Sequence, residues 1–305
     1  MSLAKKGYVG VAAATAIGAL LLTSITPAAA IVKGVPDQGE HPYVGQLLFF
    51  VPTEEDPRFD DPGAWFNCTG TLIDADTVVT AGHCTYAVGV EGEVPADPLH
   101  GGTDVWFSVE EAPDYSILPP SSTFVPDRNA DRYDAWSSAL DASDDWAQAE
   151  STFTHPGFDP AAFFLHDLGV VELAEPIELA EYGTLPEPNY LNTYYSKAAK
   201  QRGLFEQVGY GLEASGPKFS FGGDTRRKTD VKLTSFKGAH GLKNISVSFS
   251  HSKGGTCFGD SGGPVFLGSF VAGDSSYVNS LSCNATGGYQ RVDTAYARAF
   301  LEQFI

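Results

Sequence analysis

Short apolar and alternating runs recur along most of the chain, and they predict β-strands. Clusters of Gly, Pro, Asp and Asn separate them, as expected of turns. The clearest runs are Tyr43–Val51, Gly70–Ile73, Thr77–Thr80, Leu168–Leu173, Leu204–Tyr210 and Asn244–Phe249. Helical spacing is found in one segment near the end, Thr294–Ile305. Its apolar face would carry Tyr296, Phe300, Leu301 and Ile305. The pattern predicts an all-β protein with a C-terminal helix.

The strand-rich part divides into two halves near the proline-containing stretch Tyr182–Tyr190. We expect residues 31–185 to form one β-barrel and residues 186–305 to form a second one that ends in the helix. Residues 86–150 differ from the rest, because acids, Pro and Gly are scattered among a few aromatic residues. That composition predicts an acidic insertion made of surface loops.

The first thirty residues have the composition of an export signal. Lys5 and Lys6 precede a stretch rich in Ala, Leu and Ile, which ends at residues 28–30 in three alanines. A retained membrane anchor is the alternative, since the stretch approaches the roughly 18 residues that span a bilayer. The Ala-x-Ala end favours cleavage, so we expect a secreted, extracellular protein that keeps no membrane attachment.

The formal charge of −19 argues against a nucleic-acid partner. Acids gather in the run Thr53–Gly63, which could in principle collect calcium. A regular spacing of ligands is missing there, so a solvated loop is the better interpretation. We expect no metal and no cofactor.

The strongest chemical signal is a glycine-rich turn around one serine. Its sequence is Gly259-Asp260-Ser261-Gly262-Gly263-Pro264. Small residues on both sides expose the Ser261 hydroxyl and let a substrate backbone approach. Two further motifs precede it in the chain. They are Val78-Val79-Thr80-Ala81-Gly82-His83-Cys84 and Asp167-Leu168-Gly169-Val170-Val171.

These three motifs, in the order histidine, aspartate, serine, resemble the chymotrypsin and trypsin family of serine proteases. A subtilisin would place its aspartate first, and an α/β-hydrolase its serine. The resemblance covers residues 31–305, least well in residues 86–150. It implies two tandem antiparallel six-stranded β-barrels, the first carrying His83 and Asp167 and the second carrying Ser261. It also implies a monomer that acts on peptide or protein substrates.

The resemblance also implies the role of each residue. His83 would accept the proton of the Ser261 hydroxyl during attack on a peptide carbonyl, and Asp167 would hold His83 in the useful tautomer. The backbone N–H groups of Gly259 and Ser261 would form the oxyanion hole. The expected activity is therefore that of a serine endopeptidase.

Four cysteines fall into two local pairs, Cys68 with Cys84 and Cys257 with Cys283. In an exported chain these predict two disulfides. A zinc site is the competing idea, but the chain has no Cys-x-x-Cys spacing. In the family that the chain resembles, such bridges tie the histidine loop to a preceding strand and the serine loop to a pocket wall. Most other disulfides of animal members are missing, which favours a bacterial source.

The segment that begins at Ile31 resembles the mature start of activated family members, whose α-amino group pairs with the aspartate before the nucleophile, here Asp260. A buried carboxylate and ammonium must pair, because either one alone costs several kcal/mol. Ile31 directly follows the three alanines. We therefore expect signal peptidase to release it, with a cut one or two residues earlier and later trimming as the alternative.

The resemblance places the substrate pocket at a small set of positions. Its floor would be Gly255, where family members that cut after Lys or Arg carry an acid. A neutral floor and a partly blocked wall predict small or medium apolar side chains before the cut. The other positions are Thr256, Ser276, Tyr277, Val278 and Gly287.

The remaining histidines lack such motifs and are expected on the surface or in the core. They are His41, His100, His155, His166, His240 and His251. His166 would face away from the cleft if it alternates with Asp167 along a strand. Two other functions stay open: a protease-like binding protein without turnover, and an esterase that uses the same triad.

Overall fold

The computed structural model describes residues 31–162, 164–195, 197, 203–216, 219–236, 246–250 and 254–305. The expected export signal, with Lys5 and Lys6, lies outside these residues, as do His240 and His251. Among the described residues, we find no helix with the length and apolarity needed to cross a membrane.

The first half is a closed barrel in the order β2-β3-β4-β7-β6-β5. Its strands are β2 (Val44–Val51), β3 (Ala64–Leu72), β4 (Thr77–Thr80), β5 (Val105–Ser108), β6 (Ala147–Thr154) and β7 (Gly169–Leu173). All residues of β2 are buried, although a barrel strand presents only alternate residues to the interior. Leu47 and Phe49 belong to the barrel core, and Leu48 packs in an outer cluster with Trp106 and Leu140.

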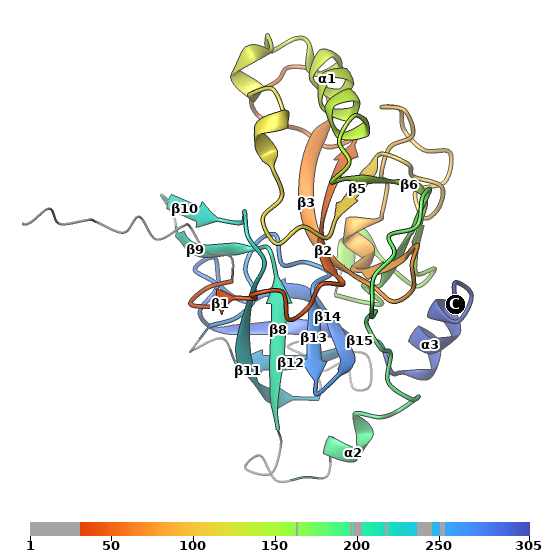
Figure 1. Ribbon diagram of the computed structural model, residues 1–305, viewed down its shortest axis with the longest axis vertical. Helices are drawn as coiled ribbons and strands as arrows, with labels where there is room; N and C mark the ends of the chain where they lie inside the picture. The colour runs from red at the N-terminus through yellow and green to blue at the C-terminus, as the bar shows by residue number, and fades with distance from the viewer. Residues whose placement is uncertain are drawn as a thin grey trace, which may run out of the picture.

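The second half is built on the order β1-β11-β12-β15-β14-β13-β8, and the additional pairing of β11 with β8 closes a ring of six strands. Its strands are β1 (Val35–Pro36), β8 (Leu204–Gly209), β11 (Arg227–Ser235), β12 (Ser246–Ser250), β13 (Pro264–Leu267), β14 (Phe270–Val278) and β15 (Thr286–Arg291). A hairpin of β9 (Leu212–Gly216) and β10 (Phe219–Gly222) stands beside it (Figure 1). The all-β expectation of two six-stranded barrels is confirmed.

The helices are few and short. They are α1 (Asn129–Asp141), α2 (Asn192–Tyr195), α3 (Ala295–Leu301) and the 3-10 turns η1 (Gly82–Cys84), η2 (Tyr115–Ile117), η3 (Ser121–Thr123) and η4 (Pro160–Ala162). Helix α3 confirms the expected C-terminal helix, and Thr294 caps it by accepting a hydrogen bond from the Ala297 N–H at 3.3 Å. It ends earlier than expected: Ile305 lies beyond it and is exposed.

Residues 86–150 are not only surface loops, and this expectation was wrong. They contain the barrel strand β5, the first residues of β6 and the helix α1, which rises above the first barrel in Figure 1. Trp106 on β5 is 1% exposed, and its Nε1–H donates to Asp141 at the end of α1. The many acids and prolines of this range led us to predict loops, although the range contains a barrel strand of four residues.

Candidate active site

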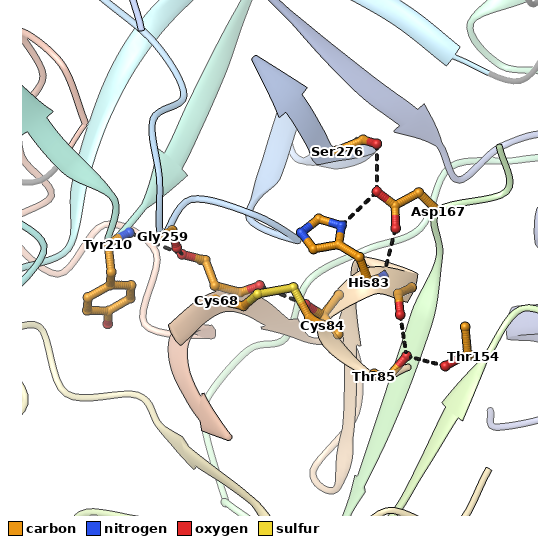
Figure 2. Close-up of a disulfide and its surroundings, with 12 residues drawn as sticks. Cys68, His83, Cys84, Thr85, Thr154, Asp167, Tyr210, Gly259 and Ser276 are labelled. Atoms are coloured by element: carbon orange, nitrogen blue, oxygen red, sulfur yellow. Dashed lines mark hydrogen bonds and ion pairs between the residues drawn. A yellow bond between two sulfur atoms is a disulfide. The ribbon is translucent and has the colours of Figure 1, made fainter. Parts of the chain in front are cut away.

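His83 is held by a short turn that a disulfide ties to the barrel. It lies in η1, directly after β4, and its neighbour Cys84 is bonded to Cys68 on β3 (Figure 2). The second bridge joins Cys257 to Cys283. Both predicted disulfides are therefore confirmed.

Asp167 is fully buried, and its carboxylate accepts three hydrogen bonds. The backbone N–H of His83 donates to Oδ1 at 2.8 Å, while Oδ2 lies 2.8 Å from His83 Nδ1 and 2.6 Å from the hydroxyl of Ser276. Figure 2 shows His83 and Ser276 converging on this carboxylate from the two barrels. These contacts fix the position of the Asp167 carboxylate beside Nδ1 and thereby orient the imidazole ring of His83.

Two opposing effects set the pKa of His83. Burial lowers it, but the charge of Asp167 and the hydrogen bond to it raise it above the ordinary value. The charged ring is thereby stabilised relative to a free imidazole, which helps a general base to hold the proton that it accepts.

His166 lies away from this carboxylate, in a setting different from the expected strand. Its φ is +53°, and β7 begins only at Gly169. The ring stacks on His155 with centroids 5.1 Å apart, and His155 in turn packs edge-on against Phe300 of α3. Strand alternation therefore does not orient His166; a left-handed backbone turn does.

The turn around Ser261 is anchored to the first barrel through Thr69 on β3. The Thr69 N–H donates to the Ser261 carbonyl at 2.8 Å, and the Thr69 hydroxyl donates to the Gly259 carbonyl at 2.9 Å. Gly259 has a φ of +97°, which favours glycine. A Cβ atom there would also lie 3.1 Å from Asn67 and Gly211.

Asp260 points inward and is fully buried. Its carboxylate accepts from the N–H groups of Gly211 at 2.7 Å and Cys257 at 2.8 Å. Burial nevertheless raises its pKa to about 7. Ile31 is also fully buried, and its backbone N donates to the carbonyl of Gly211 at 2.9 Å. The nitrogen of Ile31 and the Asp260 carboxylate therefore contact the same glycine.

Two cavities border both His83 and Ser261, and an outer cavity adjoins one of them. The small cavity, about 230 Å³, lies against β14. Its other lining residues are Thr256, Cys257, Phe258, Ser275, Ser276, Tyr277 and Val278. None of the described residues that line it is an Asp, Glu, Lys or Arg.

Two expected pocket residues do not line the small cavity. Gly255 forms a bridge with Val32, and Gly287 pairs with Val278 from the next strand. Behind the lining, the Thr256 hydroxyl contacts Tyr289 and accepts from Ser275 at 3.2 Å. The base of the cavity is therefore polar and uncharged.

The central cavity, about 500 Å³, lies beside the Cys68–Cys84 bridge. Besides His83 and Ser261 its lining is mainly apolar. It includes Phe49, Val51, Phe66, Tyr86, Ala87, Phe158, Pro160 and Phe258. The outer cavity, about 640 Å³, shares Phe66, Asn67 and Phe258 with it.

Side chains that could bind a metal occur in two places, at the Cys68–Cys84 bridge and in the acidic run. Among the described residues, one group of His, Cys and acids is close enough to hold an ion, namely Cys68, His83 and Cys84, but both sulfurs form the disulfide. In the acidic run, Asp56 pairs with Arg58 at 2.6 Å and Arg132 at 2.7 Å. Asp56 and Arg132, which are both buried, therefore form an ion pair.

Several contacts of the site were not predicted from the sequence. Asp274 on β14 is buried, and neither carboxylate oxygen has a hydrogen-bond partner among the described residues. Burial, followed by the charge of Asp167, raises its pKa well above the ordinary value. The contact of Ser276 with Asp167 spans 109 residues, and the Thr69 contact with Gly259 spans 190. Local motifs carry no signal for such pairs.

Comparison with known proteins agrees with the fold. A family model described as trypsin matches residues 127–299, which is more than half of the chain. No curated protein matches the sequence.

Solved structures with this fold include HL collagenase, with a TM-score of 0.58, 19% identity, and coverage of 90% of this chain and 98% of that one. Human heparin-binding protein has a TM-score of 0.58, 18% identity, and coverage of 90% and 96%. At this identity the structures show the fold alone. With the family match and the two barrels together, the chain belongs to the trypsin family.

Proposed function

We propose that this chain is a secreted serine endopeptidase with Ser261 as nucleophile, His83 as general base and Asp167 as the residue that orients the base. One observation carries the proposal. The imidazole of His83 is bonded to a buried carboxylate that two further donors hold, and it borders two cavities together with Ser261. That arrangement suits proton transfer to and from a substrate in either cavity.

In the proposed reaction, the Ser261 oxygen attacks the peptide carbonyl while His83 accepts its proton. His83 then donates this proton to the departing amine, which leaves an acyl group on Ser261. A water molecule repeats the sequence and releases the acid. Asp167 keeps its negative charge throughout and stabilises the imidazolium.

The carbonyl oxygen becomes negative in both steps. We assign its stabilisation to the N–H groups of Gly259 and Ser261. Each such donor contributes roughly 3 kcal/mol. The positive φ of Gly259 and the anchoring of its carbonyl by Thr69 support a preorganised turn.

Secretion and activation are part of the same proposal. Residues 1–30 supply the signal, and their removal creates the amino group of Ile31 near Asp260. That ammonium would offset the burial that raises the pKa of Asp260 to about 7. Sequencing the N-terminus of secreted material tests this, and a start other than Ile31 would contradict it.

For cleavage-site preference we propose small or medium apolar side chains before the cut. The uncharged lining of the small cavity and its volume of about 230 Å³ support this choice. A library of peptides varied at that position measures it directly. A preference for Lys or Arg would contradict the neutral pocket.

The decisive experiment is labelling of the mature protein with a fluorophosphonate, which reacts with activated serines. We expect labelling of the wild type and none of Ser261→Ala, followed by cleavage of peptide substrates. A folded protein with a free Ile31 terminus that takes no label would favour the binding-protein alternative. Cleavage of esters with no cleavage of peptides would favour the esterase.

A further inference from the structure

The outer cavity lies outside the proposed catalytic residues, between the first barrel, the segment around α1 and the β9–β10 hairpin. Its volume is about 640 Å³. Large apolar side chains dominate one wall, and charges occur at Arg58 and Asp224. The lining includes Leu48, Trp65, Phe66, Pro113, Tyr115, Leu118, Trp136, Leu212 and Phe258.

The aromatic wall is held in place before any ligand binds. The rings of Trp65 and Trp136 pack with centroids 5.3 Å apart, and Trp65 also packs on Trp106 at 5.5 Å. The Nε1–H of Trp136 donates to the carbonyl of Pro119 at 2.8 Å. Because the cavity is already formed, binding a side chain in it costs little entropy for ordering the wall.

A ridge joins the outer cavity to the central one. Phe66, Asn67 and Phe258 line both cavities, and the two phenylalanines are 41% and 45% exposed. Exposed aromatic rings between two hollows favour contact with another molecule. The central cavity in turn borders His83 and Ser261. A chain that leaves the catalytic serine along the central cavity therefore reaches the outer cavity next.

We propose that the outer cavity is a second recognition site for the polypeptide substrate, which binds an aromatic or large apolar side chain located several residues after the scissile bond. This inference rests on the proposed function. The acyl part of the substrate is assigned to the small cavity, so the departing part extends to the other side of Ser261, over the Cys68–Cys84 bridge. The segment that contains Leu118 and Trp136 then forms the distal wall.

A peptide series tests the site directly. The residues before the cut and the first residue after it stay constant, and a single Trp moves from the second to the sixth position in a Gly/Ser background. We expect one or two adjacent positions to raise kcat/KM about tenfold over the peptide without Trp, since partial burial of such a ring supplies that much binding. A Trp moved in the same way before the cut should give no comparable gain.

Two variants locate the effect. Leu118→Ser makes the wall polar, and Val125→Ser is its control, because Val125 lies in the same segment, is 54% exposed and lines none of the three cavities. The readout is the ratio of kcat/KM with and without Trp, measured within each variant. We expect the ratio to fall about threefold or more in Leu118→Ser and to stay unchanged in Val125→Ser. Thermal unfolding of each variant checks that it is folded.

A small ester substrate and the fluorophosphonate separate the two proposals, because neither carries residues after the cut. Labelling and ester cleavage with equal kcat/KM for every Trp position would overturn the second site and leave the endopeptidase standing. A Trp effect of equal size in Leu118→Ser would also overturn it. Loss of labelling in a folded wild type would instead remove the endopeptidase on which the site rests.

Discussion

Among the described residues, two histidines pair with a fully buried aspartate, His41 with Asp37 and His83 with Asp167, and their surroundings differ in one respect that matters for chemistry. His41 contacts carboxylates at both ring nitrogens, Asp37 at 2.6 Å and Glu206 at 3.2 Å, and its ring stacks on Phe266. The side chain of His83 is 28% exposed, against 11% for His41, and borders two cavities beside Ser261. The same pair of residue types thus forms an ion-pair cluster in one place and a candidate base in the other.

The two environments act on the pKa in the same direction. Burial alone would lower the pKa of His41, but the hydrogen bonds to Asp37 and Glu206 and their charges raise it to about 9. A histidine that stays protonated at neutral pH cannot serve as a base. A histidine–aspartate pair therefore indicates function only when the ring also reaches a cleft.

The largest expected effect comes from replacing each aspartate in turn. Asp167→Asn should lower kcat about 10⁴-fold, as it does in the Ser-His-Asp template, because the wrong tautomer is favoured. Asp37→Asn should leave kcat within a factor of three and lower the unfolding free energy instead, since the Arg226 guanidinium also loses its buried partner. Steady-state kinetics and urea unfolding of both variants measure this contrast. A large loss of kcat in Asp37→Asn would contradict the difference proposed between the two pairs.

The second effect concerns His41 and pH. The folded state binds the proton more tightly than the unfolded state, whose pKa is about 6.5. The stabilisation is therefore complete below about pH 6.5 and is lost as pH rises through about 9. His41→Gln should cost about 3 kcal/mol of unfolding free energy at pH 6 and much less at pH 10. An equal cost at both pH values would mean that packing on Phe266 dominates.

Asp274 offers a third contrast, because its carboxylate finds no hydrogen-bond partner in the described part of the chain, whereas that of Asp167 accepts three hydrogen bonds. Its raised pKa means that the folded state holds a proton which the unfolded state loses near pH 4. Stability should therefore fall as pH rises above 4. Asp274→Asn should raise the unfolding free energy by roughly 1–3 kcal/mol at pH 7 and leave it nearly unchanged at pH 3.5. Denaturant titrations at the two pH values decide this.

The smallest effect is expected at Ser276, which donates to the same Asp167 oxygen as His83. In Ser276→Ala the carboxylate loses one donor, so kcat/KM should fall three- to tenfold. The remaining charge attracts the imidazole proton more strongly. We expect the acid limb of the pH–rate profile, above pH 6.5 in the wild type because the pKa of His83 is raised, to move further upward. An unchanged limb would make Ser276 a pocket residue only.

Much of the fold could be predicted because its signals are local. The named apolar runs marked β4 at its observed bounds and β2, β7, β8 and β12 within two residues, but covered only the last three residues of β3. The prediction of surface loops for residues 86–150 was wrong because β5 is only four residues long and is surrounded by residues typical of turns. Helix α1 was missed for a similar reason, since few of its side chains are buried.

The sequence by itself determined many of the strands, the C-terminal helix, the two disulfides and the three motifs, because backbone preferences, turn residues and short-range spacing are encoded in neighbouring positions. Only the tertiary structure decided which histidine reaches a cleft, which carboxylate lacks partners and how Thr69 ties Gly259 to β3. These facts depend on side chains up to about two hundred residues apart meeting where two barrels pack. Burial and hydrogen bonding are properties of that meeting, so no local pattern contains them.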